Sequence, residues 1–242
     1  DVTAPGSVAA ATLAVLSLIV FDLLLDRRQL RRIEGFLGGL AESVRSAGQP
    51  ASIDHALMDS VPWSQLRMTG ARDIRMIGVT LNRTVRSHME ELKRQLDAGS
   101  VIRIAVIDPV GDAPAEAARR NGLGAAAEIF EHRVQPTLDL LAYLGGDPAS
   151  PGRLEVRLLP FVPAFGLGLI DPAAPEGQGW VDLYSHRPDG REAVILLDAD
   201  RGPRWYQHFV REFDRIWASG RPLALDLPPP GTREAARFTP LA

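Results

Sequence analysis

The sequence predicts an α/β domain, with a mixed or parallel sheet between helices, preceded by one membrane-spanning helix near the N-terminus. Two observations predict the domain. Strand-like apolar runs alternate with amphipathic helical runs from residue 72 onward, which is the pattern of an α/β fold. Of the 242 residues, 24% are charged and 45% are hydrophobic, as in an ordinary globular protein. A third observation, an apolar run near the start of the chain, predicts the membrane helix.

Residues 8–25, VAAATLAVLSLIVFDLLL, are apolar apart from Asp22 and two hydroxyl residues. A helix of this length rises roughly 27 Å, close to the hydrocarbon thickness of a bilayer. Four arginines follow within residues 27–32, which places the C-terminal side in the cytoplasm. We therefore expect residues 1–25 to form a single-pass transmembrane helix in the inner (cytoplasmic) membrane, with residues 8–25 against the lipid bilayer.

Two other readings of this run stay open. It could be a helix buried in a core or against a partner, because Asp22 interrupts it. It could also be the remnant of a signal peptide, although it lacks basic residues before it and a small-x-small site after it.

Three further segments follow the apolar run. Residues 26–49 are expected to form a juxtamembrane helix, because apolar residues recur every three or four positions until Pro50 interrupts the pattern. Residues 50–226 are expected to form the cytoplasmic α/β domain. Residues 227–242 form a proline-rich tail, whose Leu-Pro-Pro-Pro-Gly start is typical of an extended docking segment.

Within the domain, residues 50–72 look irregular, and strands and helices then alternate. The expected elements are a strand at 73–80, a helix at 84–96, a strand at 101–107, a mostly helical region at 115–144 broken near 122–124, strands at 154–159, 180–184 and 192–197, and a last helix that opens at Pro203. Six apolar residues of that last helix form a stripe that we expect to be core: Trp205, Tyr206, Phe209, Phe213, Ile216 and Trp217.

The composition excludes several kinds of chemistry. The chain has no cysteine, so disulfides, thiolate catalysis and cysteine metal sites are excluded. Its five histidines have no paired metal-ligand spacing, and we expect neither a metal nor a cofactor. The net charge of −3 gives no sign of a basic face, so no nucleic-acid partner is expected.

Four runs, DIRMIGVTL, LDAGSVIRIAVIDP, LEVRLLP and WYQHFVREFDRIWASGRP, follow one another within residues 70–222. In this order they resemble one half of the phospholipase D superfamily. In that family a later strand carries a His-x-Lys-x4-Asp motif, and an aromatic helix closes the unit. The resemblance implies a phospholipase D-like sheet flanked by helices. It also makes a homodimer an expectation, because relatives with one motif per chain often pair to build their site.

The motif itself is degenerate in this chain. If Asp171 is aligned with the motif aspartate, Ala164 stands in place of the histidine and Gly166 in place of the lysine. In the family, the histidine attacks phosphorus and the lysine neutralises the phosphoryl oxygens, and alanine and glycine can do neither. The resemblance therefore implies a module that is inactive as a phospholipase D, and whether the chain is an enzyme of another kind stays open.

Candidate binding residues lie in the strand-to-helix turn Thr80–Thr84 and just after it. We single out Asn82, Arg83, Thr84 and Arg86, whose side chains and free backbone N–H groups could hold a phosphate or carboxylate. Helix capping is the alternative role of Asn82 and Thr84. His186, in a later turn-like segment, completes the candidate set.

Three functions follow from these features. The first is a membrane-tethered, inactive phospholipase D-like module that binds a protein partner as a subunit or adaptor of a larger assembly. The second is a cytoplasmic sensor of a nucleotide-like or anionic ligand in a membrane signalling or defence effector. The third is a hydrolase with a rebuilt site, which requires the candidate groups to converge: Asp108, Asp171, Asp198 and His186.

Overall fold

The computed structural model describes residues 56–124, 126–185 and 193–225. The chain divides into two units, residues 1–55 and residues 56–242. The expected transmembrane helix, the juxtamembrane helix, the proline-rich tail and His186 all lie outside the described residues. Among the residues described, no helix is both long enough and apolar enough to span a membrane.

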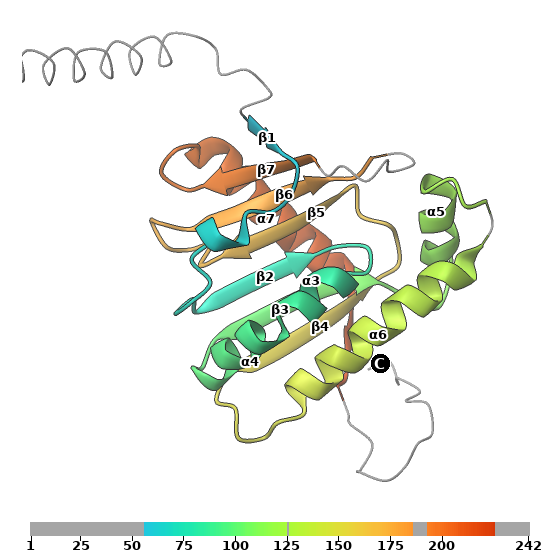
Figure 1. Cartoon of the computed structure of the whole chain (residues 1–242), viewed down its shortest axis with the longest axis horizontal. Coiled ribbons are helices and arrows are strands. Elements are labelled where there is room, and N and C mark those ends of the chain that lie inside the picture. The colour runs from blue at the N-terminus through green and yellow to red at the C-terminus, as the bar shows by residue number, and fades with distance from the viewer. Residues whose placement is uncertain (1–55, 125, 186–192, 226–242) are drawn as a thin grey trace, which may run out of the picture. The chain divides into compact units, whose positions relative to one another are not determined.

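The described part of the second unit is a mixed α/β fold built on one large sheet, as the sequence predicts. The strands are ordered β1-β7-β6-β5-β2-β3-β4-β8 across the sheet (Figure 1). The neighbouring strands β2, β3 and β4 run parallel, and the other pairs are antiparallel. The strands are β1 (Leu57–Met58), β2 (Asp73–Ile77), β3 (Val101–Ile107), β4 (Arg153–Leu159), β5 (Phe165–Ile170), β6 (Gln178–Leu183), β7 (Ala193–Asp198) and β8 (Arg221–Leu223).

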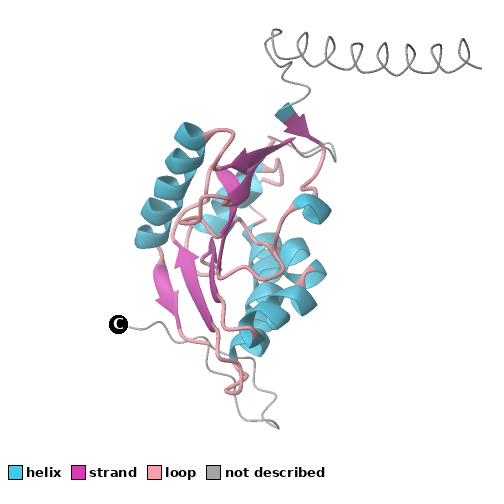
Figure 2. Cartoon of the chain, turned by 90° about the vertical axis from the view of Figure 1, so that its left-hand side faces the viewer, coloured by secondary structure: helices cyan, strands magenta, loops and turns pink. Residues whose placement is uncertain are grey.

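Helices cover both faces of this sheet (Figure 2). On one face lie α3 (Asn82–Ser87), α4 (Met89–Asp97) and α6 (Ala127–Gly145), with α5 (Ala113–Arg120) packed against α6. On the other face lies α7 (Pro203–Ser219). A short 3-10 helix, η1 (Trp63–Gln65), follows β1.

Two hydrophobic clusters correspond to the two faces. Ile74 and Met76 of β2 belong to the cluster under α4 and α6. Ile77 belongs to the second cluster, together with Tyr206 and Phe213 of α7. Because side chains alternate along a strand, one short apolar run supplies both cores.

Most of the predicted elements are present, with three differences. The predicted helix 84–96 is two helices, α3 and α4, because the backbone leaves helical geometry at His88 (φ −114°, ψ 17°). The aromatic stripe of α7 is core at Tyr206, Phe213 and Ile216, but Trp205 is 62% exposed, so its assignment to the core is wrong. Strands β1, β5 and β8 were not expected.

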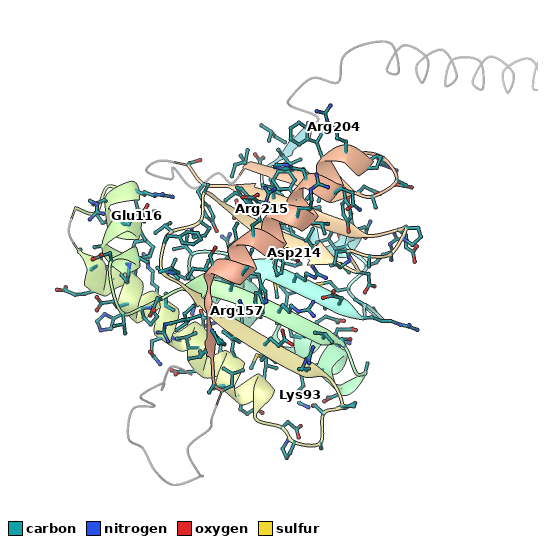
Figure 3. The ribbon with its side chains drawn as sticks, turned by 180° about the vertical axis from the view of Figure 1, so that it is seen from behind. Lys93, Glu116, Arg157, Arg204, Asp214 and Arg215 are labelled. Carbon is teal, nitrogen blue, oxygen red and sulfur yellow. The ribbon has the colours of Figure 1, made fainter. Side chains whose placement is uncertain are left out.

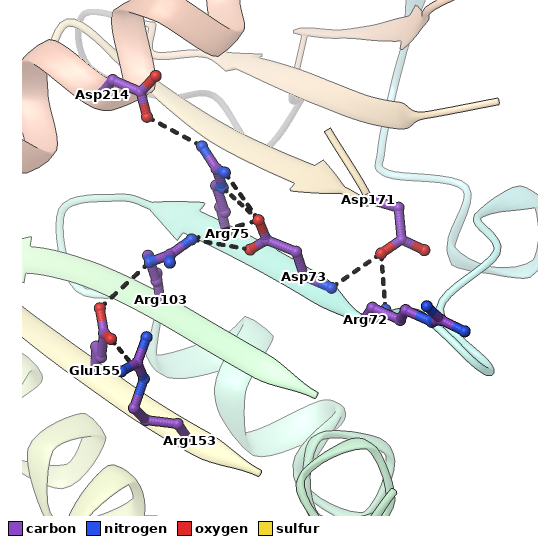
Figure 4. Close-up of polar contacts among 8 residues, drawn as sticks. All are labelled: Arg72, Asp73, Arg75, Arg103, Arg153, Glu155, Asp171 and Asp214. Carbon is purple, nitrogen blue, oxygen red and sulfur yellow. Dashed lines mark hydrogen bonds and ion pairs between the residues drawn. The ribbon is translucent and has the colours of Figure 1, made fainter. Parts of the chain in front are cut away.

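The sheet face that carries α7 holds a set of ion pairs. Seen from that side (Figure 3), Asp214 lies on α7 and Arg157 lies under its last turns. Arg157 donates a hydrogen bond to the carbonyl of Trp217 (2.8 Å) and stacks on its ring. Figure 4 shows the remaining charges, which are paired across β2, β3 and β4: Asp73 with Arg75 and Arg103, Arg75 with Asp214, and Glu155 with Arg103 and Arg153. These charges satisfy one another, so this face is not the candidate site.

Candidate ligand pocket

A cavity of about 530 Å³ lies over β5 and β6, beside α3. We call it the β5–β6 cavity. The segment Asp59–Trp63, which follows β1, forms one of its walls. This volume is within the range of small-molecule sites in proteins. Its lining residues are Asp59, Ser60, Val61, Trp63, Ile77, Leu81, Arg83, Thr84, Ser87, His88, Gly166, Leu167, Trp180, Asp182 and Tyr184.

Two glycines of β5 shape this part of the sheet. A Cβ atom on Gly168 would lie 2.1–2.4 Å from the ring of Trp180, so the missing side chain makes room for that ring. A Cβ atom on Gly166 would lie 3.0 Å from the Tyr184 hydroxyl and 3.1 Å from the Cβ of Asp182. Gly166 therefore lies beneath Tyr184 and Asp182, and it contributes only backbone to the floor of the cavity.

Contacts between three rings form the aromatic wall. Trp63 packs edge-to-face on Trp180 at 4.8 Å between ring centroids, and tilted on His88 at 3.9 Å. Burial lowers the pKa of His88, and the charge of Glu91 opposes this only in part. His88 is therefore neutral at pH 7, and the wall carries no positive charge of its own.

Asp182 of β6 and Tyr184, which follows β6, supply polar groups to the cavity. Burial raises the pKa of Asp182, while the charge of Arg83 acts in the opposite direction. Burial of the hydroxyl, together with the nearby charge of Asp182, also raises the pKa of Tyr184. The Tyr184 hydroxyl accepts a hydrogen bond from the backbone N–H of Val79 (3.3 Å). No group in the described stretches donates a hydrogen bond to the Asp182 carboxylate.

The turn before α3 is strained. Leu81 lines the cavity with φ at +49°, in the left-handed region that a branched side chain rarely adopts. Its side chain lies over Gly78, where an added Cβ would come within 2.5 Å of it. Backbone strain of this kind concentrates at binding and catalytic sites.

The structure separates the four residues proposed for the strand-to-helix turn. Arg83 and Thr84 line the cavity. Asn82 instead donates a hydrogen bond to Thr137 (3.4 Å), whose hydroxyl donates to the Thr80 carbonyl (2.8 Å), and so joins the turn to α6. Arg86 is exposed and lies outside the lining. One of these two arginines, Arg83, therefore lines the cavity.

The degenerate motif positions are also separated. Gly166 is the floor of the cavity, whereas Ala164 is exposed and precedes β5. Asp171 follows the other end of β5 with φ at +47°. Its carboxylate accepts hydrogen bonds from the backbone N–H groups of Arg72 (2.7 Å) and Asp73 (2.9 Å), as Figure 4 shows. Asp171 therefore fixes the start of β2 and is not part of the cavity.

The carboxylates of the hydrolase hypothesis do not converge. Asp108, which follows β3, makes a two-point ion pair with Arg221 (2.7 and 3.0 Å). Asp171 and Asp198 lie at the opposite end of the sheet, where β2 begins. In the described ranges, no group of three or more acidic or histidine side chains is placed to hold a metal ion.

The polar and aromatic residues of β6, and Tyr184 just after it, were not among the sequence candidates. Trp180, Asp182 and Tyr184 stand at alternate positions, so they point to one face of a strand. The glycine-rich run FGLGLI faces them from β5. That pairing of Gly-x-Gly with Trp-x-Asp-x-Tyr is the sequence signal that could have located the cavity.

Comparison with known proteins identifies the class but not an activity. Residues 53–224 match the family described as domain of unknown function DUF5919, and the chain belongs to this family. No curated protein matches the chain. Among solved structures, one similar chain is from TrmBL2, an archaeal chromatin protein with a novel mode of DNA binding. It shares 13% sequence identity at a TM-score of 0.40, over 90% of this chain and 70% of that one.

This likeness corrects one expectation. The net charge led us to expect no nucleic-acid partner, but a structure that resembles the chain belongs to a DNA-binding protein. That exclusion is therefore withdrawn. A likeness of this degree carries no argument that the present chain binds DNA.

Proposed function

We propose that the domain is a phospholipase D-like fold that has lost catalysis and acts as a sensor of a small ligand, behind a membrane anchor formed by residues 8–25. The β5–β6 cavity is the observation that carries this proposal. It combines an aromatic wall, a half-buried carboxylate and one arginine in a space of small-molecule size. The expectation of a cytoplasmic domain at the inner membrane is part of the same proposal.

The residues of the cavity favour binding over turnover. Gly166 offers no functional group, and the neutral His88 is packed against Trp63. Asp182 is held in a partly desolvated position, and the lining set contains no lysine and only one histidine, His88, whose ring packs on Trp63. A pocket of this composition recognises a ligand through hydrogen bonds and ring contacts.

Ligand binding can be tested by filling the cavity. Ser87 is exposed on α3 and lines the cavity, so Ser87→Trp fills it without disturbing the core. Arg86→Trp places the same ring on the neighbouring exposed position outside the lining and is the matched control. We expect a panel of mononucleotides, sugar phosphates and amino acids to contain a compound that raises the Tm of the detergent-extracted full chain by about 5–10 °C at 100 times its Kd.

The two variants should then differ. Ser87→Trp should abolish the shift in Tm, and Arg86→Trp should keep it. If Ser87→Trp responds to the compound as the wild type does, the compound binds elsewhere and the β5–β6 cavity is not the sensor site.

A second observation favours a protein-binding role. A cavity of about 730 Å³ is lined by residues of β6 and β7, by the first turns of α7, and by Gln65 and Leu66. Its rim includes Leu196, 36% exposed, and Trp205, 62% exposed. Exposed aromatic side chains beside an apolar groove are typical of interaction surfaces.

This second role predicts a stoichiometric complex in native membranes that depends on Trp205. Trp205→Ser should release the partner from the extracted complex. Tyr143→Ser, which removes an equally exposed ring (66%) from α6, should not. Equal recovery of the partner with both variants would count against docking at this groove.

A further inference from the structure

We propose that the β5–β6 cavity takes a nucleoside 5′-monophosphate, with Asp182 accepting two adjacent hydrogen bonds from the ligand, a ring of the ligand against Trp63, and the phosphate beside Arg83. This inference rests on the proposed function, because it names the ligand of the same cavity.

The Asp182 carboxylate determines which hydrogen-bonding groups the ligand must bring. An ionised carboxylate only accepts hydrogen bonds, and its two oxygens suit a pair of neighbouring donors. It is partly buried, no hydrogen bond to it is made from the described residues, and the charge of Arg83 offsets its desolvation only in part. A ligand that brings two adjacent donors would satisfy this acceptor.

The ring of Trp63 favours a ligand that has a planar ring. Trp63 is partly buried and is held between Trp180 and His88, so its orientation is set before a ligand arrives. A preorganised ring loses little entropy on binding. Nucleobases stack on aromatic side chains with about 1–3 kcal/mol per base.

The charge of the lining limits the ligand to one phosphate. Arg83 is the single lysine or arginine among the lining residues, whereas Asp59 and Asp182 are both acidic. A triphosphate would bring more negative charge than one guanidinium offsets, and it would face the two carboxylates. The hydroxyls of Thr84 and Ser87, on the same helix as Arg83, add hydrogen-bond donors for one phosphate.

Two parts of a ribonucleotide carry adjacent donors. The Watson–Crick edge of guanine presents N1–H beside its N2 amino group, and the ribose presents its 2′,3′-diol. Adenine presents an acceptor at N1, which a carboxylate would repel. The two sources of the donor pair therefore make different predictions for three ligands of nearly equal size.

The test is calorimetric titration of the detergent-extracted full chain with guanosine, adenosine and 2′-deoxyguanosine 5′-monophosphates. If the guanine edge meets Asp182, both guanine nucleotides bind and the adenosine nucleotide binds at least 10-fold more weakly. If the diol meets Asp182, both ribonucleotides bind and the deoxynucleotide binds at least 10-fold more weakly. Either pattern supports the proposal, and absence of binding by all three overturns it.

Asp182→Asn tests the assigned acceptor. Asparagine keeps the shape but loses the charge and one of the two acceptor oxygens, so affinity should fall about 10- to 100-fold. Asp214→Asn removes an exposed carboxylate of α7 outside the cavity and should leave affinity unchanged. Unchanged affinity in Asp182→Asn overturns the proposal.

Folding of the Asp182→Asn variant can be checked independently. Because burial raises the pKa of Asp182, the ionised form opposes folding at neutral pH, and the variant should melt no lower than the wild type at pH 7. The difference in Tm should narrow as the pH falls through the raised pKa, since protonation removes the same cost from the wild type. Loss of binding with an unchanged or higher Tm is therefore loss of recognition.

Failure of this inference differs from failure of the proposed function. If the nucleotides do not bind but another compound raises the Tm in a way that Ser87→Trp abolishes, the sensor function stands and the ligand class is wrong. If no compound does so, both proposals fall.

Discussion

Asp171 shows how a side chain selected from a motif can have a structural role. It adopts a left-handed backbone conformation and accepts two backbone hydrogen bonds at the start of β2. Its own N–H donates to the Asp73 carbonyl at 2.8 Å. The cost of the positive φ is therefore offset by a closed set of hydrogen bonds that joins β5 to β2.

Replacing this carboxylate should destabilise the fold. We expect Asp171→Ala to lower the free energy of unfolding by about 2–3 kcal/mol, because two backbone donors lose a charged acceptor. Asp171→Asn should cost less than half of that, since asparagine keeps an acceptor and tolerates positive φ. Urea denaturation of the two variants measures the difference. Equal losses would show that the hydrogen bonds contribute little.

For single residues, the sequence predicted the kinds of side chain at the site better than it predicted which of them lie there. Arg83 and Thr84 do line the cavity, because the strand-to-helix turn was recognised correctly. Arg86 does not, since residues two positions apart on a helix, as Thr84 and Arg86 are, do not share a face. The carboxylate of Asp108 is paired with Arg221. This partner lies 113 positions away, and no local pattern could identify it.

Strand β5 is the element that shapes the site. Its sequence alternates glycine with larger apolar residues, so one face is filled and the other is bare. The apolar residues Leu167 and Leu169 pack under α7. The glycines face Trp180 and Asp182 and leave the space that these side chains and the cavity share.

The fit at Gly168 can be tested by adding a single methyl group. Gly168→Ala should lower stability by about 3 kcal/mol or more, because the new Cβ overlaps the Trp180 ring. Gly99→Ala is the control, since Gly99 has φ at +93° and nothing within 4 Å, and should cost about 1–2 kcal/mol of backbone strain. Adding Trp180→Leu should recover part of the loss in Gly168→Ala and none in Gly99→Ala, as read by thermal unfolding. Additive losses in both backgrounds would contradict the proposed overlap.

Elements with a continuous apolar run were predictable from the sequence. Strand β3 has the predicted bounds, 101–107, because a strand covered on both faces is apolar throughout. β5 was not predicted, since two glycines in six residues lower the strand propensity. The break between α3 and α4 was also missed, because the apolar spacing continues across His88 and only the backbone changes there.

For the whole molecule, the phospholipase D-like proposal has a direct consequence for activity. The wild-type chain should hydrolyse bis(p-nitrophenyl) phosphate no faster than buffer does. Ala164→His should not create activity, because position 164 precedes β5 and no lysine stands at position 166. A lysine introduced at position 166 would meet Tyr184 and Asp182 at its Cβ. Turnover by the purified wild type, measured as release of p-nitrophenol, would contradict the loss of catalysis.

The architecture of the described domain could be predicted from the sequence better than the site could. Alternation of strands and helices is a local signal, and it predicted a sheet flanked by helices. The cavity depends on which strands become neighbours, since β5 and β6 approach α3 only because β5 pairs with β2. That antiparallel pairing joins residues about a hundred positions apart, and no periodicity in the chain encodes it.

The wall of the cavity at Asp59–Trp63 also has a thermodynamic consequence. Only the short strand β1 separates this segment, in sequence, from the first 55 residues of the chain. A ligand that presses on Trp63 restrains the point at which those residues join the domain. By reciprocity, if a change in the first 55 residues displaces this wall and alters ligand affinity by some factor, the ligand alters the equilibrium constant of that change by the same factor.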